Sequence, residues 1–209
     1  MAEAVLPARE PLLRRALWLE ALTITWNVLE AAIALVAGFL AGSIALVGFG
    51  LDSIIETIAA VALYRRLSAE LRGASLEDVV AHEKRALRIV GITFLVLSAY
   101  ILFESGMTLW QQDAPAPSGV GIVLAGVSLV VMPVLALGKL WTSRALDSGA
   151  LIADSKETFV CSYLSLCLLI GLGANAIFGW WWADPAAALL MLPWVVKEGF
   201  EALEGDSCE

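Results

Sequence analysis

The sequence predicts an all-α integral membrane protein with six transmembrane helices. Its 209 residues are 60% hydrophobic and only 16% charged, and the mean hydropathy is +0.83. A soluble domain is about 45–50% apolar and about a quarter charged, so this composition is typical of a membrane protein. Because a helix needs about 20 apolar residues to cross a bilayer, the chain has room for six short-looped crossings but not for a separate soluble catalytic module.

Six apolar stretches, separated by charge clusters and by turns rich in Pro or Gly, form the predicted helices. They cover residues 17–39, 43–64, 88–110, 118–141, 148–173 and 180–197. The first stretch is not a signal peptide, because it is longer than the apolar core of a signal and is interrupted by Glu20, Asn27 and Glu30. We therefore keep it as the first transmembrane helix.

The basic residues predict the orientation of the chain. All 13 Lys and Arg residues precede the first stretch, connect the second to the third, border or enter the fourth and fifth, or end the sixth. The positive-inside rule then puts both termini in the cytoplasm. We expect the membrane to be the inner or plasma membrane of a bacterium. The expected organisation is a cytoplasmic N-terminal segment (1–16), a transmembrane domain (17–197) and a short cytoplasmic tail (198–209) without a C-terminal metal-binding domain.

Acidic side chains interrupt the predicted helices at depths where charge is costly. A carboxylate at mid-bilayer costs about 2.5–3.5 kcal/mol on insertion scales, so each one needs a partner or a function. Asp52 and Glu56 stand four residues apart, as do Glu157 and Cys161, and this spacing stacks each pair on one helix face. From spacing alone, such pairs bind a cation, share a proton or join neighbouring helices.

An internal repeat relates the two pairs. Residues 43–56 read SIALVGFGLDSIIE and residues 148–161 read SGALIADSKETFVC, at a constant offset of 105 residues without a gap. Asp52 corresponds to Glu157, and Glu56 corresponds to Cys161. The two predicted helices run in opposite directions, and weak inverted repeats of this kind place substrate sites near the bilayer midplane.

Together the two pairs predict a metal site. Its four candidate ligands are Asp52, Glu56, Glu157 and Cys161. An approximately tetrahedral set of oxygen and sulfur donors suits a transition-metal dication, whereas Ca²⁺ takes six to eight oxygens and Mg²⁺ keeps a hydrated octahedral shell. Because the ligands carry more charge than a dication if all of them ionise, protons compete with the metal, and proton exchange becomes possible.

Other polar residues in the predicted spans are accessory candidates for a metal or proton path. Glu30, with Asn27 beside it, either lines such a path or hydrogen-bonds a neighbouring helix. Asp154 is either a ligand at the entrance of the site or the partner of Lys156 or Lys139.

Two further residues have weaker functional interpretations. Asp184, next to Pro185, is expected to cap the sixth helix. His82, the one His of the chain, either binds a metal with the acidic residues around it or belongs to a solvated run of charges, and we favour the second interpretation.

Three motifs resemble the cation diffusion facilitator, or cation efflux, family of divalent-metal exporters. GSIALVGFGLDSIIE is similar to the second helix of that family, ALIADSKETFVCSYLS to its fifth, and WWADPAAALLM to the start of its sixth. The resemblance implies a six-helix cation-efflux-like bundle, cytoplasmic termini, a homodimer and proton-coupled metal efflux by alternating access. It also implies that the metal ligands of the family fall on Asp52 and Glu56 and on Glu157 and Cys161.

The chain departs from the family pattern in two respects. Zinc-transporting members often have His in the metal site, whereas here Glu157 and Cys161 replace the usual residues of the fifth helix. Many members also carry a cytoplasmic metal-binding domain after the sixth helix, whereas about ten residues follow it here. We therefore expect a homodimer to form through the membrane helices.

The sequence thus favours a proton-coupled exporter of a divalent transition metal. Zn²⁺ is the first choice, with Fe²⁺, Mn²⁺, Co²⁺ or Cd²⁺ as alternatives, since the thiolate favours softer ions and the oxygens admit harder ones. The expected partners are the metal ion, protons, the lipid bilayer and a second copy of the chain, with no prosthetic group and no nucleic acid. The alternatives are a non-transporting metal sensor or buffer, and a membrane-embedded enzyme, for which a nucleophile and His base and a nucleotide motif are absent from the sequence.

Overall fold

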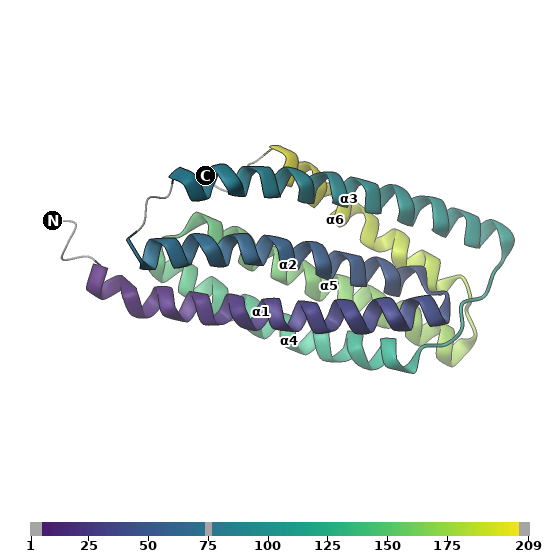
Figure 1. The fold of residues 1–209 in the computed structure, drawn as a ribbon. Helices are drawn as coiled ribbons and strands as arrows, with labels where there is room; N and C mark the ends of the chain where they lie inside the picture. Colours follow the sequence, from purple (N-terminus) through teal and green to yellow (C-terminus); the bar gives the residue numbers. More distant parts are fainter. Residues whose placement is uncertain (1–5, 74–76, 205–209) are drawn as a thin grey trace.

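A computed structural model describes residues 6–73 and 77–204, with side chains over 9–73 and 91–203. This part of the chain folds into six helices and contains no strand: α1 Leu6–Ala41, α2 Ile44–Leu71, α3 Glu77–Gln111, α4 Gly119–Leu146, α5 Gly149–Phe178 and α6 Ala183–Glu204. Successive helices alternate in direction, so α1 begins and α6 ends at the same end of the bundle (Figure 1). We call this the terminal end, and the opposite one the far end.

The helices pack in three main pairs. α1 lies along α2, α4 along α5, and α3 along α6, while α1 also packs on α4. In Figure 1 the α3–α6 pair lies to one side of the other four helices. The interior between these helices is filled by buried apolar side chains such as Phe49, Leu124, Met132 and Leu168. Most of the buried polar side chains come from α1, α2, α4 and α5.

At the terminal end, helices continue beyond the predicted apolar stretches. α1 begins at Leu6, and α2 ends at Leu71. Arg9 joins these extensions, since its Nη2 donates to Oε1 of Glu70 at 3.1 Å and to the backbone carbonyl of Leu146 at 3.1 Å. Residues 6–16 of the expected N-terminal segment are thus part of α1. The prediction missed this extension because hydropathy marks only the part of a helix that crosses lipid.

Asp184 lies at the start of α6 but caps a different helix from the one we predicted. Its carboxylate accepts hydrogen bonds from the hydroxyl of Ser43 and from the backbone N–H groups of Ile44 (2.9 Å) and Ala45 (3.4 Å). The prediction that Asp184 caps α6 was therefore wrong, because α6 begins beside the start of α2. The unpaired N–H groups and positive dipole there attract a carboxylate.

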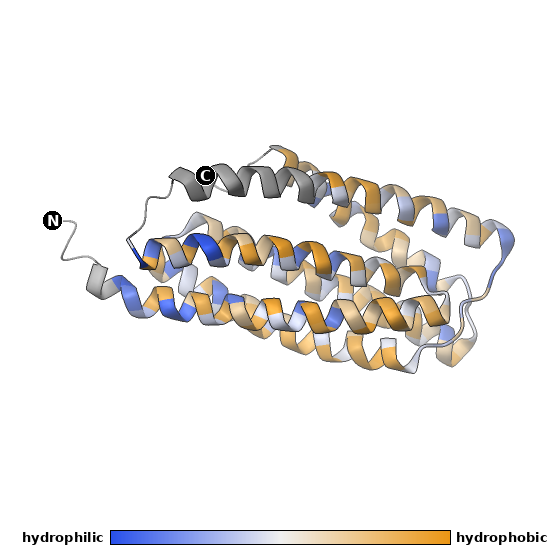
Figure 2. Ribbon diagram, in the orientation of Figure 1, coloured by the Kyte–Doolittle hydropathy of each residue, from blue (hydrophilic) through white to orange (hydrophobic). Residues whose placement is uncertain are grey.

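Hydropathy along the bundle is that of an integral membrane protein. Five helices are long and apolar enough to cross a membrane: α1 from Arg9, α2, α3 from Gly91, α4 and α5. The shorter α6 has 22 residues and charges near both ends. Figure 2 shows apolar residues along the middle of the helices and hydrophilic residues at the terminal ends of α1 and α2. The prediction of an all-α membrane bundle is confirmed.

Candidate metal centre

Asp52, Glu56 and Cys161 meet in the interior of the bundle. One ligand atom from each of these side chains lies within 4.8 Å of the others. Asp52 and Glu56 come from successive turns of α2, and Cys161 comes from α5. Two carboxylate groups and one sulfur from two helices are therefore close enough to bind a single metal ion.

Hydrogen bonds hold Glu56 in this cluster. Its Oε2 accepts from Sγ of Cys161 at 3.3 Å and from Nδ2 of Asn27, on α1, at 3.0 Å. Asn27 is fully buried, and its Oδ1 has no hydrogen-bond partner. The predicted accessory residue Asn27 therefore lies beside the cluster and contacts one of its ligands directly.

Asp52 is the least satisfied side chain of the cluster. It is only 1% exposed, and neither of its carboxylate oxygens has a hydrogen-bond partner. Burying an unpaired polar group costs free energy, and burying an unpaired charge costs far more. The carboxylate thus needs a cation or a proton, and its chemistry fits a metal held together with Glu56 and Cys161.

Close helix packing brings Asp52 to its position. Gly50, two residues earlier on α2, faces α1 so closely that an added Cβ would lie 2.9 Å from Cγ of Leu35 and 3.1 Å from Cβ of Ala34. At Gly38 of α1, an added Cβ would lie 2.8 Å from a side-chain carbon of Val47. The absence of side chains at these two glycines lets α1 and α2 approach each other next to the cluster.

Glu30 is buried one helical turn from Asn27 and hydrogen-bonds two neighbouring helices. Ser53 on α2 donates to its Oε2 at 3.0 Å, and Ser128 on α4 donates to its Oε1. Trp26 in turn donates to the hydroxyl of Ser128 at 3.3 Å. Of the two interpretations of Glu30, the structure therefore shows the contacts of the one in which it joins neighbouring helices.

Glu157, the fourth predicted ligand, lies outside the three-residue cluster in this structure. Its side chain is half-buried and interacts electrostatically with Asp154, Lys139 and Asp52. Glu157 is therefore near the cluster without sharing its centre, and binding through all four predicted ligands would require the Glu157 side chain to move.

Asp154 forms an ion pair inside the bundle. Its Oδ2 lies 2.6 Å from Nζ of Lys139 on α4, and the same ammonium lies 3.2 Å from Oε2 of Glu20 on α1. Of the two lysines considered as partners of Asp154 from the sequence, Lys139 is the one that pairs with it in the structure. Glu20 stands out in the sequence only as an interruption of the first apolar stretch, and its pairing with a residue 119 positions away could not be read from spacing.

Glu198 on α6 is a nearby acidic residue that the sequence reasoning missed. It is half-buried and interacts electrostatically with Asp52, Glu56 and Glu157. It falls after the last apolar stretch, among the charges that end α6, and nothing in its sequence context distinguishes it from a solvated residue. His82 lies outside the part of the chain whose side chains are described.

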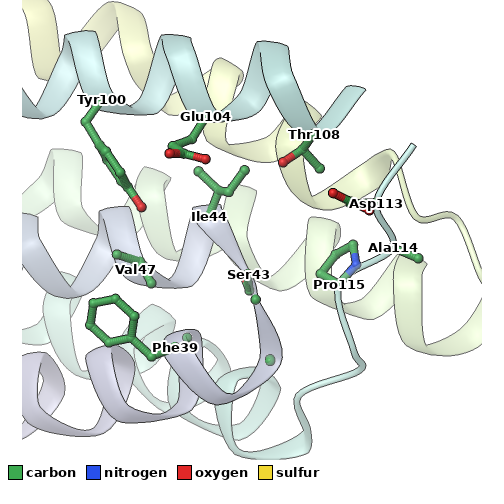
Figure 3. A pocket seen from close by; sticks show the side chains of 13 residues that line it. Phe39, Ser43, Ile44, Val47, Tyr100, Glu104, Thr108, Asp113, Ala114 and Pro115 are labelled. Atoms are coloured by element: carbon green, nitrogen blue, oxygen red, sulfur yellow. The ribbon is translucent and has the colours of Figure 1, made fainter. Parts of the chain in front are cut away.

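A separate cavity of about 350 Å³ opens at the far end of the bundle (Figure 3). Tyr100, Glu104 and Thr108 line it from α3, and Asp113 lines it from the α3–α4 connection. In Figure 3 the side chains of Tyr100 and Glu104 extend toward α2 near Ile44. None of the three clustered residues lines this cavity, so it is distinct from the metal centre.

Comparisons with known proteins agree with the fold of a cation efflux transmembrane domain. The family model described as the cation efflux transmembrane domain matches residues 86–204, which include Cys161 but not Asp52 or Glu56. The chain is also 25% identical over 172 residues to the cation-efflux pump FieF of Shewanella oneidensis. The aligned region covers 81% of this chain and 58% of that protein, so the chain spans little more than half the length of this relative.

Proposed function

Because this chain belongs to the cation efflux family, we propose that it exports a divalent transition-metal cation in exchange for protons, by alternating access. The observation that carries the proposal is the buried carboxylate of Asp52. Both of its oxygens lack a hydrogen-bond partner, and they lie in a cluster with Glu56 and Cys161. Among the described residues, no side chain donates a hydrogen bond to this carboxylate or forms an ion pair with it. A bound divalent cation would neutralise its charge.

Asp52, Glu56 and Cys161 hold the ion in the proposed bound state, and Glu157 completes the set. Glu157 is the repeat partner of Asp52 and interacts with it electrostatically, so a divalent ion between them would attract both. Movement of Glu157 toward the ion would provide the fourth ligand of a tetrahedral site. The donor set favours Zn²⁺, with Fe²⁺, Mn²⁺, Co²⁺ and Cd²⁺ as alternatives.

Protons drive release of the ion in this proposal. Ionised Asp52, Glu56 and Cys161 carry more negative charge than a divalent cation neutralises, so each ligand that takes up a proton weakens the binding of the metal. Access that alternates between the two ends lets the site load at one end and release the ion by protonation at the other.

The proposed orientation and assembly follow from the charges and from the family. The terminal end carries the concentration of Arg residues and faces the cytoplasm of a bacterial inner membrane, and the far end faces outward. Two copies of the chain pack through their membrane helices. The site needs no covalent step, which distinguishes this function from a membrane-embedded enzyme.

Transport into proteoliposomes tests the proposal. The purified chain is reconstituted with a Zn²⁺-sensitive dye inside the vesicles, and a pH gradient is imposed with the interior acidic. We expect Asp52→Asn to abolish Zn²⁺ entry, while Asp113→Asn, on the exposed α3–α4 connection, keeps the native rate. Unchanged entry in Asp52→Asn would contradict the proposed site. Zn²⁺ binding without flux by the native chain would instead indicate a metal sensor or buffer.

A further inference from the structure

The interior of the helix bundle contains a positively charged side chain. Among the described residues, Lys139 on α4 is the only Lys or Arg that is buried, with a side chain that is 0% exposed. Its Nζ lies 3.2 Å from Oε2 of Glu20, 2.6 Å from Oδ2 of Asp154 and 3.4 Å from Oγ1 of Thr158. The ammonium thus joins α1, α4 and α5 at one point.

The acceptors around this ammonium make a complete cation site. A lysine ammonium has three N–H donors, and each has one acceptor here. Glu20 is 0% exposed, and its second oxygen, Oε1, has no hydrogen-bond partner. Two carboxyl groups therefore face one ammonium, and another cation could bind in its place if the ammonium were removed.

The site lies directly beside the proposed transport ligands. Asp154 precedes Glu157 by one helical turn, and Thr158 follows it in the chain, so Lys139 contacts α5 on both sides of Glu157. Lys139 also interacts electrostatically with Glu157. A metal ion bound between Glu20 and Asp154 would thus compete with the cluster of Asp52 for the same incoming ions.

We propose that Lys139 is a tethered cation that fills a second cation-binding site, formed by Glu20, Asp154 and Thr158. Because Lys139 fills this second site, metal ions cannot bind there and bind only at the cluster of Asp52, Glu56 and Cys161. This part of the inference rests on the proposed function. Asp154 then contributes to selectivity by holding the internal cation, not by binding the transported ion.

The donor atoms predict which metal the emptied site would take. Glu20, Asp154 and Thr158 offer only oxygen atoms, which suit Mn²⁺ and other hard cations, whereas the sulfur of Cys161 favours softer ions. Mn²⁺ is therefore the appropriate probe for the second site, and Zn²⁺ is the appropriate probe for the cluster.

Mn²⁺ binding to the purified full chain in detergent tests the inference. Lys139→Met keeps an unbranched apolar side chain that is one atom shorter, and it removes the charge. We expect it to bind one more Mn²⁺ per chain than the native protein, in equilibrium dialysis and in the electron paramagnetic resonance signal of bound Mn²⁺. The extra ion should be lost in Lys139→Met/Asp154→Asn and absent in Lys139→Arg, which keeps the charge.

The outcomes separate this inference from the proposed function. Persistence of the extra ion in Lys139→Met/Asp52→Asn would support a site independent of the transport cluster, even if the native chain proved not to transport metal. A folded Lys139→Met with the native Mn²⁺ stoichiometry would overturn the inference. If Lys139→Met is recovered as a monodisperse protein only with Mn²⁺ present, the inference is supported. If Lys139→Met aggregates without Mn²⁺ and Mn²⁺ does not restore a monodisperse protein, the inference is wrong.

Discussion

Cys161 on α5 donates its thiol hydrogen to Glu56 on α2, with Sγ 3.3 Å from Oε2. These two residues are 105 positions apart, which is the offset between the two copies of the internal repeat. The contact therefore joins corresponding positions of two helices that run in opposite directions. A similarity visible in the sequence thus has a direct structural counterpart at the centre of the bundle.

Cys161→Ser should change which metals are transported. The hydroxyl keeps a donor for Glu56 but replaces the sulfur ligand with oxygen, so Cd²⁺ and Zn²⁺ should lose more than Mn²⁺. The ratio of Cd²⁺ to Mn²⁺ transport in proteoliposomes measures this, and we expect it to fall about tenfold, which corresponds to about 1.4 kcal/mol. Cys167→Ser is the matched control, and an equal change in both variants would remove the sulfur of Cys161 from the site.

Gly50→Ala should separate α1 from α2 beside the cluster. The new Cβ would lie 2.9 Å from Cγ of Leu35, and overpacking of this kind costs about 1–3 kcal/mol. We expect a lower thermal midpoint and weaker Zn²⁺ binding. Gly126→Ala is the control, since an added Cβ there meets nothing within 4 Å. If the two variants behave alike, close approach at Gly50 is not required.

Ser128→Ala should destabilise the bundle by leaving Oε1 of Glu30 without its donor. Loss of a hydrogen bond to a buried acceptor costs about 1 kcal/mol, a value that also suits bonds between membrane helices. Unfolding in mixed detergent micelles measures the change. Ser98→Ala removes a hydroxyl that bonds only within its own helix, to the carbonyl of Phe94, and should have a smaller effect.

Asp184→Ala should loosen the start of α2. The variant removes the acceptor of the Ile44 and Ala45 N–H groups and of the Ser43 hydroxyl, and loss of a helix cap costs about 0.5–2 kcal/mol. Hydrogen exchange should become faster at Ile44 and Ala45 and stay unchanged at the start of α4, where Ser118 is the cap. Unchanged exchange at Ile44 would show that Ser43 caps α2 alone.

The helices and part of the site could be predicted from the sequence because both depend on local patterns. Hydropathy and charge mark where a helix crosses lipid, and the spacing of Asp52 and Glu56 places them on one face. The repeat adds the relation between α2 and α5, which is why Cys161 could be paired with Glu56. It could not indicate that Glu157 stays outside the cluster, since side-chain rotation leaves no mark in residue spacing.

Contacts between distant helices were harder to predict. Glu20 and Lys139 lie in different apolar stretches, and only the packing of α1 on α4 brings their charges to 3.2 Å. The cap formed by Asp184 likewise depends on α6 beginning beside α2. In both cases the signal available in the sequence was a charge at an unfavourable depth, which indicates that a partner exists without saying which one.

The central claim is that Asp52, Glu56 and Cys161 hold the transported metal, and X-ray absorption at the zinc edge tests it most directly. For the purified chain loaded with one Zn²⁺, we predict one sulfur neighbour at about 2.3 Å and oxygen neighbours at about 2.0–2.2 Å. The sulfur should disappear in Cys161→Ser and remain in Cys167→Ser. A first shell made only of oxygen or nitrogen in the native chain, or a sulfur that persists in Cys161→Ser, would contradict the account.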